Sequence, residues 1–271
     1  MKPKHLFQAE EIVAGYENKT VIHNISLELP SNQISVIIGA NACGKSTLLK
    51  TLARIIKPTA GKITLDGKSI GQFPAKQFAR TVGLLPQSPI VPEGITVADL
   101  VGRGRFPHQA LFAAWTKEDY HAVAEAMEMM NITELANHHI DELSGGQRQR
   151  VWIAMALAQQ TDILFLDEPT TFLDITYQVE ILDLLTDLNH TYGTTIVMVL
   201  HDINLSARYA DHIFALHQGK MVAQGEPAQV ITSKIINQIF GLKCTVIKDP
   251  VSSSPLVVPI GRHHSVQDKH A

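Results

Sequence analysis

Nine residues, from Gly39 to Thr47, have the types and spacing needed to hold phosphate groups. They begin with the segment GANACGKS, which fits the pattern G-x-x-x-x-G-K-[ST], where glycines let successive backbone N–H groups turn inward around an anion. The helix that follows adds the positive end of its dipole. We expect Lys45 to reach the β- and γ-phosphates of ATP and the Ser46 hydroxyl to bind Mg²⁺. The predicted nucleotide-binding residues of this loop are Gly39, Ala40, Asn41, Ala42, Cys43, Gly44, Lys45, Ser46 and Thr47.

Two acids, Asp167 and Glu168, follow a second apolar run at 163–166. In α/β sheets ligands collect at the carboxyl ends of the strands, so acids placed there can face a bound nucleotide. Asp167 would hold Mg²⁺ through water, and Glu168 would act as the general base that polarises the attacking water. Taken alone, an acid pair after a strand favours a solvated strand end. Beside the phosphate-binding loop, we interpret it as the hydrolytic part of an ATPase site.

The elements that must position these residues alternate between strand and helix. Residues 33–38 form a short β-branched run, which predicts a buried strand. A helix is predicted over 45–56, ended by Lys57-Pro58, with one apolar face made of Leu48, Leu49, Leu52, Ile55 and Ile56. The same alternation returns later, with strands at 163–166 and 195–200 and helices at 175–190 and 203–209. It predicts an α/β fold with a mainly parallel sheet, and the phosphate-binding loop makes this the core of a P-loop NTPase.

Two stretches depart from this alternation. Residues 25–29 alternate apolar and polar, the period of a half-buried strand, in an N-terminal third that reads as strands and turns. From about 89 to 160 helical patterns dominate, which we interpret as an inserted helical subdomain with helices at 95–101, 117–130 and 145–159.

Near the end of the chain the sequence predicts a β-hairpin. Its turn is Gln218-Gly219-Lys220, between strands at 213–217 and 221–223.

The bulk composition narrows the class of protein. The 271 residues are 45% hydrophobic, which is ample for a buried core, and the net charge of -3 with a pI of about 6.5 does not favour a partner made of DNA or RNA. Two cysteines imply no disulfide framework and fit a reducing cytosol. The N-terminus lacks the apolar region of a signal peptide, and no apolar run reaches the roughly 20 residues of a membrane span. We therefore expect any membrane role to come through a partner.

The segment Leu143-Ser144-Gly145-Gly146-Gln147 resembles the signature of the ATP-binding cassette (ABC) family. Its glycines allow close backbone approach, and the helix after it supplies an N-terminal dipole. Ser144 fits two roles, as a cap of that helix and as a ligand of a phosphate. The resemblance implies that Ser144, Gly145, Gly146 and Gln147 bind a nucleotide.

Four more residues match elements of the same family in order. The resemblance implies that Tyr16 stacks on adenine and that Gln87, in a Q-loop, touches Mg²⁺ or water and senses a membrane partner. It also implies that Asp174 belongs to a D-loop and that His201 is a switch histidine in contact with the γ-phosphate. For Tyr16 a core position in an N-terminal strand remains the alternative. With Ser46 and Asp167, Gln87 completes the expected Mg²⁺ ligands.

The resemblance also implies an architecture and partners. A single ABC ATPase domain would span 1–271, with the core and an N-terminal antiparallel β subdomain in 1–87 and 161–242, the helical subdomain in 88–160 and a C-terminal extension in 243–271. Two copies would form a head-to-tail dimer, each ATP lying between the P-loop of one copy and residues 144–147 of the other. The dimer would dock on transmembrane permease subunits at the cytoplasmic face of a bacterial membrane, and indirectly serve a substrate-binding protein.

Three stretches, 96–109, 169–175 and 201–212, resemble importers of iron(III)–siderophore chelates, with haem and cobalamin importers as relatives. The cargo would be chosen by the permease and the binding protein, so haem or cobalamin import stays an alternative. A soluble ABC ATPase without a transport role is a second alternative, although such proteins usually carry two cassettes. An ATP-binding scaffold with little turnover is a third, against which Glu168 and His201 stand.

Two residues of the loop depart from the family pattern. The loop usually has glycine where this chain has Ala42, and often proline where it has Ala40. Alanine fits if its φ is negative and costs about 1 kcal/mol if φ is positive. Beside it, Cys43 lies two residues before Lys45, whose positive charge we expect to lower the thiol pKa and to make the thiol open to alkylation. A small residue that only fills the loop is the equal alternative.

Overall fold

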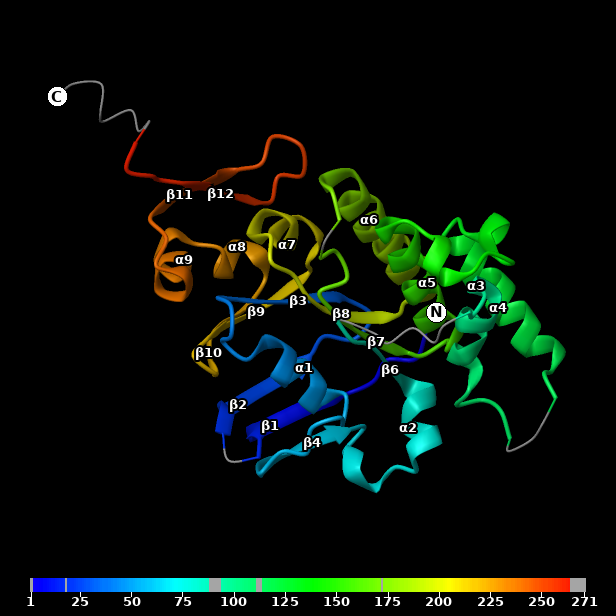
Figure 1. The fold of residues 1–271 in the computed structure, drawn as a ribbon. Helices are drawn as coiled ribbons and strands as arrows, with labels where there is room; N and C mark the ends of the chain where they lie inside the picture. The colour runs from blue at the N-terminus through cyan, green and yellow to red at the C-terminus, as the bar shows by residue number, and fades with distance from the viewer. Residues whose placement is uncertain (1, 18, 88–93, 111–113, 172, 264–271) are drawn as a thin grey trace. The chain divides into compact units, whose positions relative to one another are not determined.

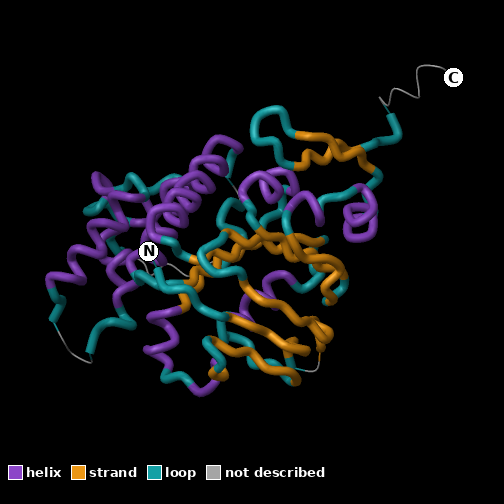
Figure 2. Tube along the Cα trace, turned by 180° about the vertical axis from the view of Figure 1, so that it is seen from behind, coloured by secondary structure: helices purple, strands orange, loops and turns teal. Residues whose placement is uncertain are grey.

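The computed structural model describes residues 2–17, 19–87, 94–110, 114–171 and 173–263. These residues divide into two compact units, each of which combines helices and strands (Figure 1 and Figure 2). The first unit is built from Met1–Leu6, Ser31–Gln33 and Thr64–Met198, and the second from Phe7–Pro30, Ile34–Ile63 and Val199–Ala271.

Neighbouring strands form the centre of the first unit, in the order β8 (Thr195–Val199), β7 (Ile163–Asp167) and β6 (Val82–Leu85). Strands β6 and β7 run parallel. Every residue of β7 and β8 is buried, which is typical of aliphatic strands covered on both faces. The strands predicted at 163–166 and 195–200 are therefore confirmed.

Side-chain caps set the starts of the long helices in this unit. Thr116 and Asp119 form a capping box at the start of α4, and Asp174 caps α6, which ends at Gly193 in the left-handed conformation. The four helices predicted at 95–101, 117–130, 145–159 and 175–190 are confirmed, with ends that differ by one or two residues. The helices of this unit are α2 (Ala75–Thr81), α3 (Val97–Gly102), α4 (Lys117–Met129), α5 (Gly145–Ala158) and α6 (Ile175–Tyr192), with the short turns η1 (Ile70–Gln72), η2 (Arg103–Arg105), η3 (Thr133–Leu135) and η4 (Ile140–Glu142).

The second unit contains an antiparallel pair and a mixed set of strands. Strand β1 (Phe7–Tyr16) pairs antiparallel with β2 (Lys19–Leu29). In the other set, β3 (Ile34–Gly39) runs parallel to β9 (His212–His217), and β10 (Lys220–Gly225) returns antiparallel to β9. The predicted hairpin around Gln218 is thus confirmed. The helices are α1 (Lys45–Leu52), α7 (Ile203–Tyr209), α8 (Pro227–Val230) and α9 (Ser233–Phe240); β4 (Ala60–Leu65) pairs with β5 (Lys68–Ser69) where the chain passes into the first unit.

A second hairpin, which the sequence reading did not predict, lies near the C-terminus. Strand β11 (Cys244–Lys248) pairs antiparallel with β12 (Pro255–Pro259). The turn that joins them is built on Asp249, whose side chain accepts hydrogen bonds from the backbone N–H groups of Val251 and Ser252. The signal was present as two β-branched runs around a Ser- and Pro-rich turn.

The prediction that the first helix runs to residue 56 is wrong, because α1 ends at Leu52. Arg54 adopts a left-handed conformation with φ 63, which ends the helix. Glycine is the usual residue in this conformation, so an arginine gives no signal of a helix end in the sequence. The N–H groups of Ile55 and Ile56 both turn back to the carbonyl of Lys50. Ile55 is 67% exposed and does not belong to the buried face.

His5 links the N-terminal segment of the first unit to two carboxylates of the same unit. His5 Nδ1 lies 2.7 Å from Asp66 Oδ2, and its Nε2 lies 3.1 Å from Asp162 Oδ2. Burial lowers the pKa of His5, but the hydrogen bonds and charges of the two carboxylates outweigh it, so this pKa lies above its ordinary 6.5.

The raised pKa of His5 predicts a pH-dependent stability. The contacts of protonated His5 stabilise the folded protein fully below pH 6.5, the ordinary pKa of histidine. This stabilisation is lost as the pH rises through the higher pKa that His5 has in the folded protein. We expect His5→Gln to lower the melting temperature most at acidic pH and least in alkaline buffer, measured by thermal unfolding across a pH series. His121→Gln, at a histidine 79% exposed, serves as the control. A loss that is the same at every pH would contradict this account.

Candidate functional site

The phosphate-binding loop joins β3 to α1 in the second unit, and two of its positions require glycine, Gly44 by its backbone conformation and Gly39 by lack of space. Gly44 has φ 106, and a Cβ there would lie 2.8 Å from Ile22 Cδ1. A Cβ at Gly39 would lie 2.5 Å from the carbonyl oxygen of Leu216. The loop can therefore keep this path only with glycine at both positions.

Lys45 is the buried cation at the centre of this loop. It is 5% exposed, and its Nζ donates to the carbonyl oxygens of Gly39 at 2.9 Å and Ala40 at 3.1 Å. The ammonium group is thus held inside the turn of the loop, where a phosphate would replace carbonyl oxygens as its acceptor. Ser46 is half-buried in the first turn of α1, and Thr47 beside it is buried.

The departure at Ala42 is strained. Ala42 adopts φ 60, the left-handed conformation that is costly for alanine. We expect Ala42→Gly to raise the free energy of unfolding by about 0.5 kcal/mol, because relief of about 1–2 kcal/mol of strain exceeds the entropy cost of glycine, about 0.4–1 kcal/mol. Chemical denaturation measures it.

The matched control for Ala42→Gly is Ala228→Gly, at an exposed alanine in α8 that has no positive φ. There the same change brings only the entropy cost and should lower stability. If both variants lose stability equally, Ala42 is not strained.

The expectation for the Cys43 thiol is wrong. Cys43 is 6% exposed, and burial raises the pKa of this thiol by more than the nearby charge of Lys45 lowers it. The lysine was visible in the sequence, but the burial was not. A buried thiol with a raised pKa reacts slowly with alkylating agents, so Cys43 packs the loop rather than offering a nucleophile.

In the first unit, two predicted residues meet directly. Asp167 ends β7 and is 1% exposed, and Glu168 follows it with φ 58 and 9% exposure. Gln87 Nε2 donates to Glu168 Oε2 at 2.5 Å, and Thr171 Oγ1 donates to the same oxygen at 3.1 Å. Two donors thus orient the Glu168 carboxylate, while the amide oxygen of Gln87 stays available as an acceptor.

Two glutamines that the sequence did not predict donate hydrogen bonds to the backbone after Glu168. Gln149 Nε2, from α5, donates to the carbonyl of Pro169 at 2.7 Å. Gln178 Nε2, from α6, donates to the carbonyls of Thr170 at 3.4 Å and Leu173 at 3.0 Å. Asp174 caps α6 through the N–H of Tyr177. Phe172, part of the expected D-loop, lies outside the described residues.

The signature segment, residues 143–147, leads into α5, and Ser144 caps this helix as predicted. Ser144 Oγ accepts from the N–H of Gln147 at 3.3 Å, and Gln147 Oε1 accepts from the N–H of Ser144 at 3.0 Å, a complete capping box. A Cβ on Gly146 would contact the ring of Tyr177 at 3.5 Å. A Cβ on Gly145 would meet no described atom within 4 Å. The face at Gly145 is therefore open to a group from outside the chain.

The remaining predicted residues lie in the second unit and are exposed. Tyr16 ends β1 with 49% exposure, so it is not a core residue. His201 is exposed directly before α7, whose N-terminus is capped by Asp202 through the N–H of Leu205 at 2.8 Å. Both rings are thus accessible to a ligand.

The residues predicted for Mg²⁺ fit that ion by their chemistry. Mg²⁺ prefers oxygen ligands and keeps several waters. Ser46 offers a half-buried hydroxyl, Asp167 a buried carboxylate at a strand end, and Gln87 its amide oxygen. In the described part of the chain no group of three or more His, Cys, Asp or Glu side chains forms a metal site of another kind.

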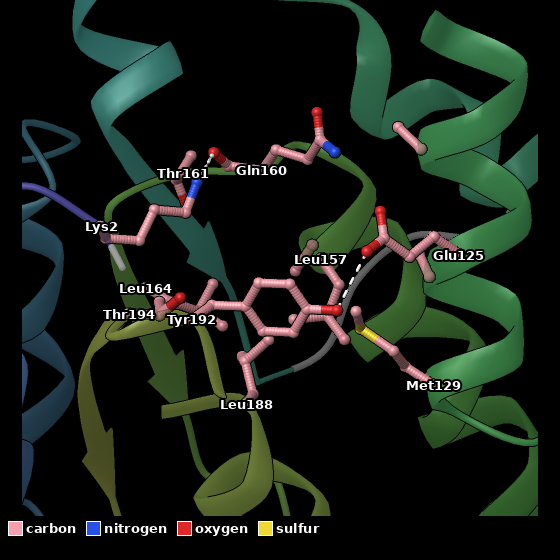
Figure 3. Close-up of a pocket in the computed structure, with 13 residues that line it drawn as sticks. Lys2, Glu125, Met129, Leu157, Gln160, Thr161, Leu164, Leu188, Tyr192 and Thr194 are labelled. Carbon is pink, nitrogen blue, oxygen red and sulfur yellow. Dashed lines mark hydrogen bonds between the residues drawn. The ribbon is translucent and has the colours of Figure 1, made fainter. Parts of the chain in front are cut away.

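A separate pocket of about 90 Å³ lies in the first unit, among side chains of α4, α5, α6 and β7 (Figure 3). Tyr192 Oη donates to Glu125 Oε1 at 3.0 Å across it, and Lys2 Nζ donates to the carbonyl of Gln160 at 2.8 Å. The residues that line it include none of the predicted site residues. Its volume lies below the roughly 300 Å³ of a small ligand site, so it is too small to hold a nucleotide.

Known proteins match the chain over most of its length. The family model described as ABC transporter matches residues 22–171. The ferric enterobactin transport ATP-binding protein FepC of Escherichia coli (strain K12) is 51% identical over 255 residues, which cover 94% of each protein. The achromobactin transport ATP-binding protein CbrD of Dickeya dadantii (strain 3937) is 47% identical over 254 residues, again 94% of each. A dimeric structure of MJ0796, a bacterial ABC transporter cassette, has a TM-score of 0.71 and 27% identity over 81% of this chain and 98% of that one.

Proposed function

Since the chain belongs to the ABC transporter family, we propose that it hydrolyses Mg-ATP to drive the uptake of an iron(III)–siderophore chelate. ATP hydrolysis is the activity of this family. The chain also has the fold of the family, a mixed α/β fold with an antiparallel β part. The observation that carries the cargo is the identity of 51% with a ferric enterobactin transport protein over 94% of both chains.

The proposed chemistry assigns a role to each group. Lys45 and the loop N–H groups bind the β- and γ-phosphates, and Tyr16 stacks on the adenine. Glu168, oriented by Gln87 and Thr171, accepts a proton from water as the water oxygen bonds to the γ-phosphorus. The bond between that phosphorus and the bridging oxygen breaks, and ADP and phosphate result.

Two further groups act on the terminal phosphate. His201 contacts the γ-phosphate and holds it in place. Ser46, Asp167 and Gln87 would hold Mg²⁺, which when bound neutralises the phosphate charge that builds up during transfer.

A second copy of the chain is the proposed partner that completes each site. Residues 144–147 and Asp174 of one copy would face the nucleotide held by the loop of the other, and the open space at Gly145 supports this. A solved cassette with the same fold is a dimer. The helix dipole of α5 would favour the terminal phosphate at its N-terminus.

The proposed link to the membrane is a shallow depression in the first unit. It is lined by Asp99, Gly102, Arg103, Phe106, Gln109 and Trp115, and Phe106 is 66% exposed. In the described part of the chain no helix is long and apolar enough to cross a bilayer. We assign docking on permease subunits, at the cytoplasmic face of a bacterial membrane, to this surface, where Phe106 and Trp115 lie between an acid and a base. A substrate-binding protein would deliver the chelate to the permease.

Uptake by cells tests the cargo. In a strain that carries this chain with its permease, deletion of the chain should abolish accumulation of a radiolabelled ferric siderophore, and the wild-type chain, but not Lys45→Ala, should restore it. Labelled haem and cobalamin, given to the same strains, test the alternative cargoes. A chain that purifies without any permease and whose deletion changes no uptake would instead support a soluble ATPase.

A further inference from the structure

The C-terminal hairpin, which the proposed chemistry does not use, lies against the helix that follows His201. In Figure 1, β11 and β12 lie beside α7, and α7 packs on β12. All of these elements belong to the second unit.

Asn204 joins α7 to the backbone of β12 with both ends of its amide. Its Oδ1 accepts from the N–H of Val257 at 2.8 Å, and its Nδ2 donates to the carbonyl of Val257 at 3.3 Å. Asn204 lies three residues after His201, in the first turn of the helix. A paired amide of this kind fixes both the distance and the rotation of α7 relative to the strand.

Arg208 makes a second link, one turn further along α7. Its Nη2 donates to Asp249 Oδ2 at 2.8 Å, and the other oxygen of Asp249 accepts from the N–H of Val251 at 2.8 Å. The hydrogen bonds from Val251 and Arg208 hold the pKa of Asp249 at about 2, below its ordinary 3.8. The pair stays ionised over the pH range in which ATPases are assayed.

The end of α7 is fixed on the opposite side. Asp211, just after the helix, accepts from the N–H of Ile34 at 2.8 Å through its side chain and donates its own N–H to the carbonyl of Ile34 at 2.8 Å. Ile34 begins β3, which leads into the phosphate-binding loop. The helix is thus held between β3 and the hairpin, and its N-terminus carries His201.

We propose that the β11–β12 hairpin is a brace that positions His201 through α7, with Asn204 and Arg208 as its positioning residues. The inference rests on the proposed role of His201 in hydrolysis. A short helix of two turns held on one side alone can rock, and a displacement of about 1 Å in a catalytic group can cost roughly 100-fold in rate. The brace affects the chemical step rather than the binding of ATP.

The test compares the full-length wild-type chain with Asn204→Leu and Arg208→Gln, in ATP hydrolysis and in thermal unfolding. We expect each variant to lower kcat roughly 10-fold, to leave KM for ATP within about 2-fold, and to keep a cooperative melt. Arg208→Lys keeps the charge that faces Asp249 and should recover most of the rate. Asn237→Leu, the same substitution at an exposed position of α9, should match the wild type. If Asn204→Leu fails to fold, Asp249→Asn breaks the second link from the hairpin side.

A double variant separates positioning from a general loss of structure. In a His201→Ala background, Asn204→Leu should lower kcat no further, because the group that the brace positions is already gone. Full activity of Asn204→Leu and Arg208→Gln, or losses that multiply with that of His201→Ala, would overturn the brace while leaving the ATPase intact. A His201→Ala protein as active as the wild type would overturn the proposed role of His201 and the brace with it.

Discussion

Replacing Glu168 with glutamine is expected to slow ATP hydrolysis by about 10²- to 10⁴-fold while leaving ATP binding intact. Glutamine keeps the shape of the side chain and one carbonyl oxygen, so it can still accept from Gln87 and Thr171. It cannot take the proton of the attacking water. Single-turnover release of phosphate measures the chemical step, and a fluorescent ATP analogue measures binding.

The control for this prediction is Glu134→Gln, the same substitution at an exposed glutamate of the first unit. It should hydrolyse ATP at the wild-type rate. A Glu168→Gln protein that turns over within a few-fold of the wild type would show that another group is the base.

Replacing Arg105 with methionine is expected to destabilise the protein by about 3–5 kcal/mol, because it leaves the Asp119 carboxylate buried without its cation. Both side chains are 5% exposed, and Arg105 Nε lies 2.8 Å from Asp119 Oδ1. Arg105 Nη1 also donates to the carbonyl of Ala158 at 2.8 Å, at the end of α5. One guanidinium group therefore ties η2, α4 and α5 together.

Chemical denaturation measures the loss at Arg105. The control is Arg103→Met, the same substitution two residues earlier at an exposed arginine, which should stay within about 0.5 kcal/mol of the wild type. A loss below about 1 kcal/mol for Arg105→Met would mean that the buried pair adds little to stability.

Contiguous motifs made the sequence informative about both fold and site. The strands that end at Gly39 and at Asp167 were predictable because buried parallel strands read as unbroken aliphatic runs. The turn between β3 and α1 and the capping Ser144 were predictable for a similar reason, since a glycine-rich turn and a capping box need particular residues at fixed local spacing.

What the sequence did not show depends on contacts between distant residues or on burial. Gln149 reaches the carbonyl of Pro169 across 20 residues, and Asn204 reaches Val257 across 53. No sequence pattern predicts either contact, because one partner in each is a backbone group, which every residue can supply. The raised pKa of Cys43 follows from burial in the folded loop, and the end of α1 follows from the conformation of Arg54.

If each ATP is shared by two copies of this chain, the Glu168→Gln protein should dimerise when ATP is added, and sedimentation measures this. The variant should bind ATP without hydrolysing it, so we expect a shift from the 29.8 kDa monomer to a dimer on addition of Mg-ATP and none with Mg-ADP. Adding Gly145→Asp should abolish the shift without unfolding the chain. The open space at Gly145 accepts the side chain, and an acid in the first turn suits the helix but repels a phosphate. A Glu168→Gln protein that stays monomeric at saturating ATP, or a dimer that forms equally well with Gly145→Asp, would show that ATP is not shared between two copies.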